Sequence, residues 1–321
     1  MNRVDTTFAT MGGRASVRLE SEELERDELA RHARAIEELF ADVEATLTRF
    51  RPDSELSRLN ADPRPAVPAS PLVRQLASAV RWAGTRSGGL VDGTLLEGLE
   101  EQGYVTTLAG REPAPLADAL AAAPPRRAAR PHPARDYARI HVDDEGRVSR
   151  RAGVRIDSGG LGKGLAADLA ASALSPAIRY AISCGGDLAV GGPGRWPWQI
   201  AVTGAHTGAE VHRLHVRSGG IATSGIHARL WQRPDGSYAH HLLDPRTGEP
   251  AWTGLVAVTA VAASALEAEV LAKTALLSGP ARGRRLLGAR GGVLQHDDGR
   301  VEVVFGPPVV RLPRPGARAA V

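Results

Sequence analysis

The residues best suited to chemistry lie in one glycine-rich stretch. A short β-type run through Val154 and Ile156 ends at Asp157, and Ser-Gly-Gly-Leu-Gly-Lys-Gly and a helical pattern follow. Glycine lets backbone N–H groups approach a ligand because it has no Cβ. The first N–H groups of a helix are unpaired and carry partial positive charge. The stretch predicts an anion site, with phosphate as the usual occupant. A ligand-free tight turn is the alternative, because the spacing matches neither the dinucleotide fingerprint nor the P-loop.

Lysine usage points to the same stretch and to one other place. Of the 40 Lys and Arg residues, only Lys163 and Lys273 are lysine. The arginine excess, with abundant Ala and Gly, is typical of a coding bias that replaces surface lysines. A lysine that persists is expected where a planar guanidinium does not serve, although chance survival is the alternative. Lys163 and Lys273 are therefore candidate functional residues.

Acids and hydroxyls recur at turns along the chain. The pairs are Asp92/Thr94, Asp157/Ser158, Thr223/Ser224 and Asp244/Thr247, together with Asp187. Any one of them is explained by a capped loop, but together they favour a phosphate-ester site in which Mg²⁺ rides on the substrate phosphate. Zinc is not favoured, because His240 and His241 are adjacent and have no cysteine partners.

Bulk composition excludes several classes of protein. The net charge of +4 is spread along the chain and gives little support for nucleic-acid binding. The single cysteine, Cys184, rules out a disulfide framework, and we interpret it as a buried small residue rather than a nucleophile. No apolar stretch is long enough to span a membrane, and the N-terminus lacks a signal-peptide core. We expect a cytoplasmic protein.

The elements that position these residues alternate between strand and helix patterns. We predict a strand before residue 20, amphipathic helices around Ile36–Leu47 and from Ser70, and a helix over 266–277. The polar stretch 49–60 has turn chemistry, and the Ala/Pro/Arg stretch 119–135 is typical of a surface loop. A hairpin around residues 144–146 should lead into the glycine turn.

Seven short motifs run over almost the whole chain: Met11-Gly12-Gly13, Ser54 to Asn60, Asp92-Gly93-Thr94, Asp157 to Gly164 with Asp168, Ser183 to Asp187, Thr223 to Gly225, and His241 to Gly248. In their order and spacing these motifs resemble the ApbE family, the FAD:protein FMN transferases. The resemblance implies an α+β fold with mixed, mostly antiparallel sheets and packed helices. We expect residues 1–312 to form a single domain and 313–321 a loose tail.

The resemblance also implies an activity. FMN would pass from FAD to a Thr or Ser of an acceptor protein through a phosphoester bond, with release of AMP and with Mg²⁺ as cofactor. The implied FAD-site residues are Met11, Phe50, Leu90, Val91, Asp92, Asp157, Lys163, His241 and Leu242. The implied catalytic residues are Asp157, Lys163, Thr223 and Asp244, and the backbone at Gly160 would contribute to the metal site.

The chain departs from the family in its last predicted helix. Family members usually read Ala-Asp-x-x-x-Thr there, with Asp and Thr as metal ligands, whereas this chain has Glu269 and Lys273. Glu269 can bind Mg²⁺, but an ammonium group has no lone pair to offer. Either Glu269 keeps the metal and Lys273 meets a phosphate, which we favour, or the lysine charge replaces the metal.

Other departures leave alternative functions open. Ile226-His227 follows Thr-Ser-Gly where the family usually has Asp-Tyr. A flavin-binding or flavin-trafficking protein without transfer, and a metal-dependent FAD pyrophosphatase, are the alternatives to the transferase.

Overall fold

One large antiparallel sheet forms the centre of the protein in the computed structural model, which describes residues 1–306. The tail predicted at 313–321 lies outside these residues. The sheet has eight strands, in the order β1 (Asn2–Thr10), β2 (Gly13–Ser21), β6 (Arg179–Cys184), β7 (Asp187–Gly191), β10 (Gly219–Gly225), β13 (Leu255–Ala262), β14 (Gly292–His296) and β15 (Val301–Val304). Every neighbouring pair in this sheet is antiparallel. The α+β prediction with mostly antiparallel sheets is confirmed.

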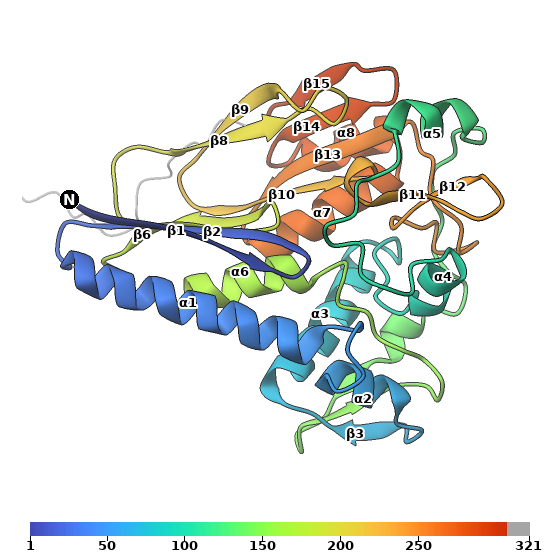
Figure 1. Ribbon diagram of the computed structural model, residues 1–321, viewed down its shortest axis with the longest axis horizontal. Helices are drawn as coiled ribbons and strands as arrows, with labels where there is room; N and C mark the ends of the chain where they lie inside the picture. The colour runs from blue at the N-terminus through green and yellow to red at the C-terminus, as the bar shows by residue number, and fades with distance from the viewer. Residues whose placement is uncertain (307–321) are drawn as a thin grey trace, which may run out of the picture.

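Helices pack against the central sheet (Figure 1). They are α1 (Arg26–Leu47), α2 (Glu55–Ala61), α3 (Pro71–Arg86), α4 (Leu96–Glu101), α5 (Leu116–Ala122), α6 (Gly162–Ser172), α7 (Ala265–Leu277) and α8 (Pro280–Leu287), with 3₁₀ turns at Asp136–Arg139 and His227–Arg229. Helix α1 packs on β1 and β2, α7 packs on β10 and β13, and α6 contacts both helices. The glycine-rich stretch therefore leads into a helix, α6, that packs against both α1 and α7.

Small sheets complete the fold. They are β3 (Ala66–Pro68) with β5 (Arg147–Ser149) and β4 (His141–Val142), the hairpin of β8 (Trp198–Thr203) and β9 (Glu210–Val216), and β11 (Leu230–Gln232) with β12 (Tyr238–His240). The predicted hairpin around 144–146 is β4–β5. Among the described residues, no helix combines the length and the apolar character needed to cross a bilayer.

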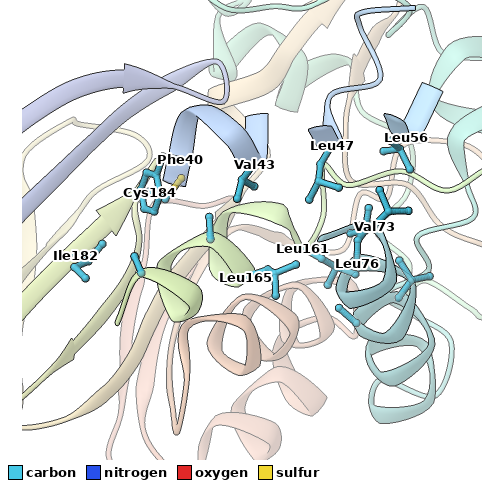
Figure 2. Packing of buried hydrophobic residues seen from close by; sticks show 14 of the residues in the cluster. Phe40, Val43, Leu47, Leu56, Val73, Leu76, Leu161, Leu165, Ile182 and Cys184 are labelled. Carbon is cyan, nitrogen blue, oxygen red and sulfur yellow. The ribbon is translucent and has the colours of Figure 1, made fainter. Parts of the chain in front are cut away.

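The main core lies between α1, α3, α6 and strands β2 and β6. In Figure 2, Val43 and Leu47 of α1 lie above Leu161 and Leu165, and Phe40 of α1 lies beside Cys184 of β6. The α1 residues recur every three or four positions, so one face of the helix is apolar and becomes buried. Cys184 is fully buried here, as predicted, and burial raises the pKa of its thiol to about 12. Its thiol is not a nucleophile at neutral pH.

Two local predictions were wrong, and a third was right only in part. The stretch around Ser54 is a helix, α2, because the Ser54 hydroxyl caps it by accepting the Ser57 N–H. The run through Val154 and Ile156 forms no strand and joins no sheet. Its partner is a side chain: the Asn60 amide accepts the Ile156 N–H and donates to the Ile156 carbonyl, both at 2.8 Å. The predicted loop 119–135 begins inside α5 and is irregular after residue 122.

Candidate functional site

A pocket opens beside the glycine turn, where five separate segments of the chain meet. Its lining comes from Leu90, Val91, Asp92, Gly93, Leu95, Leu99, Tyr104, Asp157, Gly159, Gly160, Leu161, Arg229, His241, Leu242, Leu243, Lys273 and Leu277. Leucine and aromatic side chains supply apolar walls, and two cations, two carboxylates and one imidazole supply the polar groups. This mixture suits a ligand with a flat apolar ring and an anionic part.

Asp157 is fixed at the start of the glycine turn. Its backbone N–H donates to the Gly93 carbonyl at 2.8 Å, which joins the turn to the Leu90–Leu95 loop. Its carboxylate lies 3.2 Å from Arg49 Nε and accepts the Gly159 N–H. Burial raises the pKa of this carboxyl, while Arg49 and the Gly159 N–H oppose the rise. The charged form is held by specific partners, so Asp157 has a defined orientation in the pocket wall.

Helix α6 and helix α7 are joined through their first turns. The Asp168 carboxylate accepts the N–H groups of Ala265 and Leu266 at 2.7 and 2.9 Å, and it thereby caps α7. In the other direction, the Glu269 carboxylate of α7 accepts the Gly164 N–H of α6 at 2.9 Å. Gly164 is required because an added Cβ would lie only 2.8 Å from Glu269 Oε2. These contacts set where α7 presents its side chains to the pocket.

Lys273 and Glu269 form a buried ion pair one helical turn apart. Lys273 Nζ donates to Glu269 Oε1 at 2.8 Å, and the two side chains are only 10% and 1% exposed. Lys273 lines the pocket, whereas Glu269 lies behind it. The stem of Lys273 passes close to the glycine turn, since a Cβ on Gly160 would lie 3.8 Å from Lys273 Cε. A positive charge therefore stands next to the glycine backbone.

The other lysine is engaged elsewhere. Lys163 Nζ lies 3.2 Å from Asp187 Oδ2, and Lys163 is not part of the pocket lining. Burial would lower the pKa of Lys163, but the carboxylates of Asp187 and Glu269 raise it above the usual value. Lys163 is therefore a charged partner that holds the Gly185-Gly186-Asp187 turn against the start of α6.

His241 enters the pocket as a neutral imidazole. Burial and the nearby cations, Arg229 first among them, lower its pKa well below the usual value. Its Nδ1 is buried and has no hydrogen-bond partner among the described residues. At neutral pH the ring can accept a proton, and an anionic ligand would make it more basic.

The structure brings together eight of the residues singled out from the sequence: Leu90, Val91, Asp92, Asp157, Gly160, His241, Leu242 and Lys273. Six others lie outside the lining: Met11, Phe50, Lys163, Thr223, Asp244 and Glu269. Phe50 packs against Tyr104, a residue of the lining, with 5.6 Å between the two ring centroids. Met11 adopts a positive φ of 48° and places Sδ 3.7 Å from Cys184 Sγ.

Thr223 and Asp244, expected to be catalytic, have structural contacts. The Thr223 hydroxyl pairs with that of Thr259 across β10 and β13 at 2.8 Å. Asp244 Oδ1 accepts the backbone N–H groups of Arg130 and Arg246, and so closes the Asp-Pro-Arg-Thr-Gly turn. These contacts favour positioning roles for both residues.

Sequence reasoning missed Arg229, Tyr104 and Arg49. Arg229 lines the pocket and has no ion-pair partner among residues 1–306. Arg49 stacks on the rings of Phe50 and Tyr104, at 4.3 and 4.6 Å from their centroids, while it pairs with Asp157. Abundant arginine hid both cations. Only the place of Arg229, four residues after Gly225, could have drawn attention to it.

Comparisons with known proteins agree on one family. The model of the ApbE family matches residues 11–295. An FAD:protein FMN transferase of Klebsiella pneumoniae is 28% identical over 261 residues, which are 76% of this chain and 70% of that one. One of Vibrio cholerae is 27% identical over 258 residues, 77% of this chain and 73% of that one.

Solved structures share the fold. The ApbE protein of Thermotoga maritima superposes with a TM-score of 0.76 at 24% identity, over 94% of this chain and 97% of that one. The apo form of the Pseudomonas stutzeri flavinyl transferase ApbE gives 0.72 at 24% identity, over 96% and 98%.

Proposed function

The chain belongs to the ApbE family and is an FAD:protein FMN transferase, and we propose that the pocket beside the glycine turn holds FAD during the transfer. The composition of the pocket supports this proposal, because two cations, a neutral imidazole and a glycine backbone lie together next to apolar walls. Leu90, Val91 and Leu242 would pack on the flavin ring, and Lys273 and Arg229 would meet the pyrophosphate. The acceptor is a protein that offers a Thr or Ser hydroxyl.

The transfer exchanges the phosphoanhydride bond of FAD for a phosphoester bond to the acceptor. The acceptor hydroxyl oxygen forms a bond to the FMN phosphorus, and the bond from that phosphorus to the bridging oxygen breaks. AMP leaves with the electron pair of the broken bond. We assign the acceptor's proton to Nε2 of His241, because Nδ1 is closed off from solvent. The bound pyrophosphate raises the basicity of this imidazole and prepares it for the proton.

The remaining residues position these groups. Arg229 has no carboxylate partner among the described residues, so its guanidinium is free to bind phosphoryl oxygens in a bidentate manner. Asp157 with Arg49 fixes the start of the glycine turn, whose N–H groups approach the phosphate. Lys163, Thr223 and Asp244 support the turns around the pocket.

Magnesium is the cofactor that the family resemblance implies, and the donor set at the expected place does not fit it. Glu269 Oε1 accepts from the Lys273 ammonium and Oε2 accepts the Gly164 N–H, so both carboxylate oxygens are engaged. Lys273 itself has no lone pair when charged. Residues 1–306 contain no group of three or more His, Cys, Asp or Glu side chains placed to hold a metal ion. The proposed transfer therefore uses no Mg²⁺.

The test uses the purified full chain, FAD and an acceptor domain that carries the family's Thr-containing target sequence. Transfer adds the mass of FMN to the acceptor, makes it fluoresce in a denaturing gel and releases AMP. Arg229→Met should lower the transfer rate by about 100- to 1000-fold, since removing one donor to the charge that develops in a transition state costs about 2.7–4 kcal/mol. Arg213→Met, an exposed arginine on β9, is the matched control and should leave transfer unchanged.

Three outcomes separate the candidate functions. Labelled acceptor with AMP released supports the transferase mechanism in this pocket. AMP and free FMN without a labelled acceptor would support the pyrophosphatase. Tight FAD binding with no AMP would support the flavin carrier. The Glu269–Lys273 pair, which stands on α7 where the family usually has Asp and Thr, favours the carrier over the pyrophosphatase. The predicted cytoplasmic location stays a proposal, to be checked by fractionating cells that produce the chain.

A further inference from the structure

The buried pair of Glu269 and Lys273 has a feature that packing does not explain. Burying two charges costs several kcal/mol per ion before their attraction repays it, and apolar residues of similar size often serve stability better. Here the pair lies on α7, a helix made mostly of alanine, valine and leucine. The ammonium is the member that reaches the pocket, and the carboxylate faces the start of α6. The arrangement presents one positive charge to a ligand.

Glu269 holds that charge in one direction. Its carboxylate is fixed by the Gly164 N–H at 2.9 Å, near the positive end of α6, and its second oxygen receives the ammonium at 2.8 Å. An ammonium group has three N–H donors, and Glu269 takes one of them. Among residues 1–306, Lys273 Nζ has no hydrogen-bond or ion-pair partner other than Glu269. Its remaining donors are available to a ligand in the pocket.

The position of the charge matches the ligand's anionic part. The stem of Lys273 passes beside Gly160 in the glycine turn, and Lys273 and Arg229 are the two cationic side chains of the lining. FAD carries two negative charges on its pyrophosphate, and a charge-assisted N–H···O bond needs no metal between the partners. The same place cannot hold a divalent cation together with a charged lysine, because both are positive and Glu269 is already engaged.

We infer that the ammonium of Lys273, oriented by Glu269, binds the pyrophosphate of FAD directly and that the chain binds and cleaves FAD without a divalent metal. This inference rests on the proposed function, because it assumes that FAD occupies the pocket. The sequence left two hypotheses open, and this inference favours the one in which the lysine charge replaces the metal over the one in which Glu269 keeps it. Lysine rather than arginine stands at this position because a compact ammonium fits between Glu269 and the phosphate.

The first measurement is FAD binding by the wild-type chain, followed by flavin fluorescence and by calorimetry. We expect the same Kd, within about twofold, in excess EDTA and in millimolar MgCl₂. Paramagnetic resonance of Mn²⁺ should show no bound ion in the presence of FAD, whereas Lys273→Thr, which frees Glu269 and adds a hydroxyl, should bind Mn²⁺. Loss of FAD binding in EDTA, or Mn²⁺ binding by the wild type as strong as in Lys273→Thr, would overturn the inference and leave the proposed function standing.

The second measurement removes the charge. Lys273→Met keeps the length of the side chain and should weaken FAD binding by about tenfold or more, the value of a hydrogen bond to a charged group. Binding of riboflavin, which has no phosphate, should stay within about twofold. Because Lys273→Met leaves Glu269 buried and unpaired, the double variant Glu269→Gln/Lys273→Met provides a neutral pair that keeps the Gly164 hydrogen bond. Unchanged FAD binding in a folded variant would refute the role of Lys273.

Failure of the proposed function gives a different pattern. In that case the wild type binds neither FAD nor riboflavin under any metal condition, and the inference falls with it.

Discussion

His240 gives the protein a sensitivity to acid whose size can be worked out from the structure. The side chain is fully buried, packs edge-on against Trp252 with 4.8 Å between ring centroids, and accepts the Leu242 N–H at Nδ1. Burial lowers its pKa to about 3 from the usual 6.5. The folded protein therefore keeps this imidazole neutral at pH values where the unfolded chain has already bound a proton.

The sign and the magnitude follow from proton linkage. Between the two pKa values the unfolded state binds more protons, so the free energy of unfolding falls as the pH falls below 6.5. At pH 5 the unfolded imidazole is almost fully protonated, and the loss from His240 alone is about 2 kcal/mol relative to pH 7. The His240→Asn variant keeps an oxygen that accepts the Leu242 N–H but has no group that titrates, so it should lack this share of the loss.

Urea unfolding followed by tryptophan fluorescence at pH 7 and pH 5 measures the difference. The wild type should lose about 2 kcal/mol more stability between these values than His240→Asn does, whatever the absolute stability of the variant. His241, whose pKa is also lowered, keeps its own share in both proteins. His215→Asn, at an exposed position on β9, should behave like the wild type. Equal losses in the wild type and His240→Asn would refute the reasoning.

Two further predictions concern the junction of α6 and α7. Gly164→Ala should destabilise the fold by about 1–3 kcal/mol, because the added Cβ would meet Glu269 Oε2 and the Leu266 backbone at 2.8 Å. Thermal unfolding measures this, with Gly13→Ala, whose Cβ would meet nothing closer than 3.9 Å, as the control. Asp168→Asn should cost about 1–2 kcal/mol, since it removes the charged cap from the first N–H groups of α7. An unchanged melting temperature would contradict the capping role.

The glycine turn, the helix that contains Lys273 and the main amphipathic helices could be predicted from the sequence, because they depend on the local spacing of residues. Helix α7 was predicted at 266–277 and runs from Ala265 to Leu277. Lys273 and Lys163 stood out through composition alone. Composition could not show that the two lysines have different surroundings. Lys163 pairs with Asp187 outside the pocket lining, whereas Lys273 faces the pocket. That difference depends on which neighbours long-range packing brings to each lysine.

The missed residues have the same explanation. The run before Asp157 has a strand pattern, but the side chain of Asn60, 96 residues earlier, takes the place of a neighbouring strand. Arg229 ends a short 3₁₀ turn and Tyr104 lies in an irregular segment, and contacts with distant parts of the chain set the course of both. No periodicity marks such residues, so only the folded structure places them beside Asp157.

The charges at the α6–α7 junction act as one positioning system. Asp168 of α6 caps α7, and Glu269 of α7 accepts a hydrogen bond from the first turn of α6, so neither helix can shift without breaking a charged contact of the other. Glu269 is the common member, since it also holds the Lys273 ammonium. A single carboxylate thus couples the position of the glycine turn to the position of the pocket's charge. In the proposed complex with FAD both meet the same phosphate, so this coupling gives the buried acid a role that needs no metal.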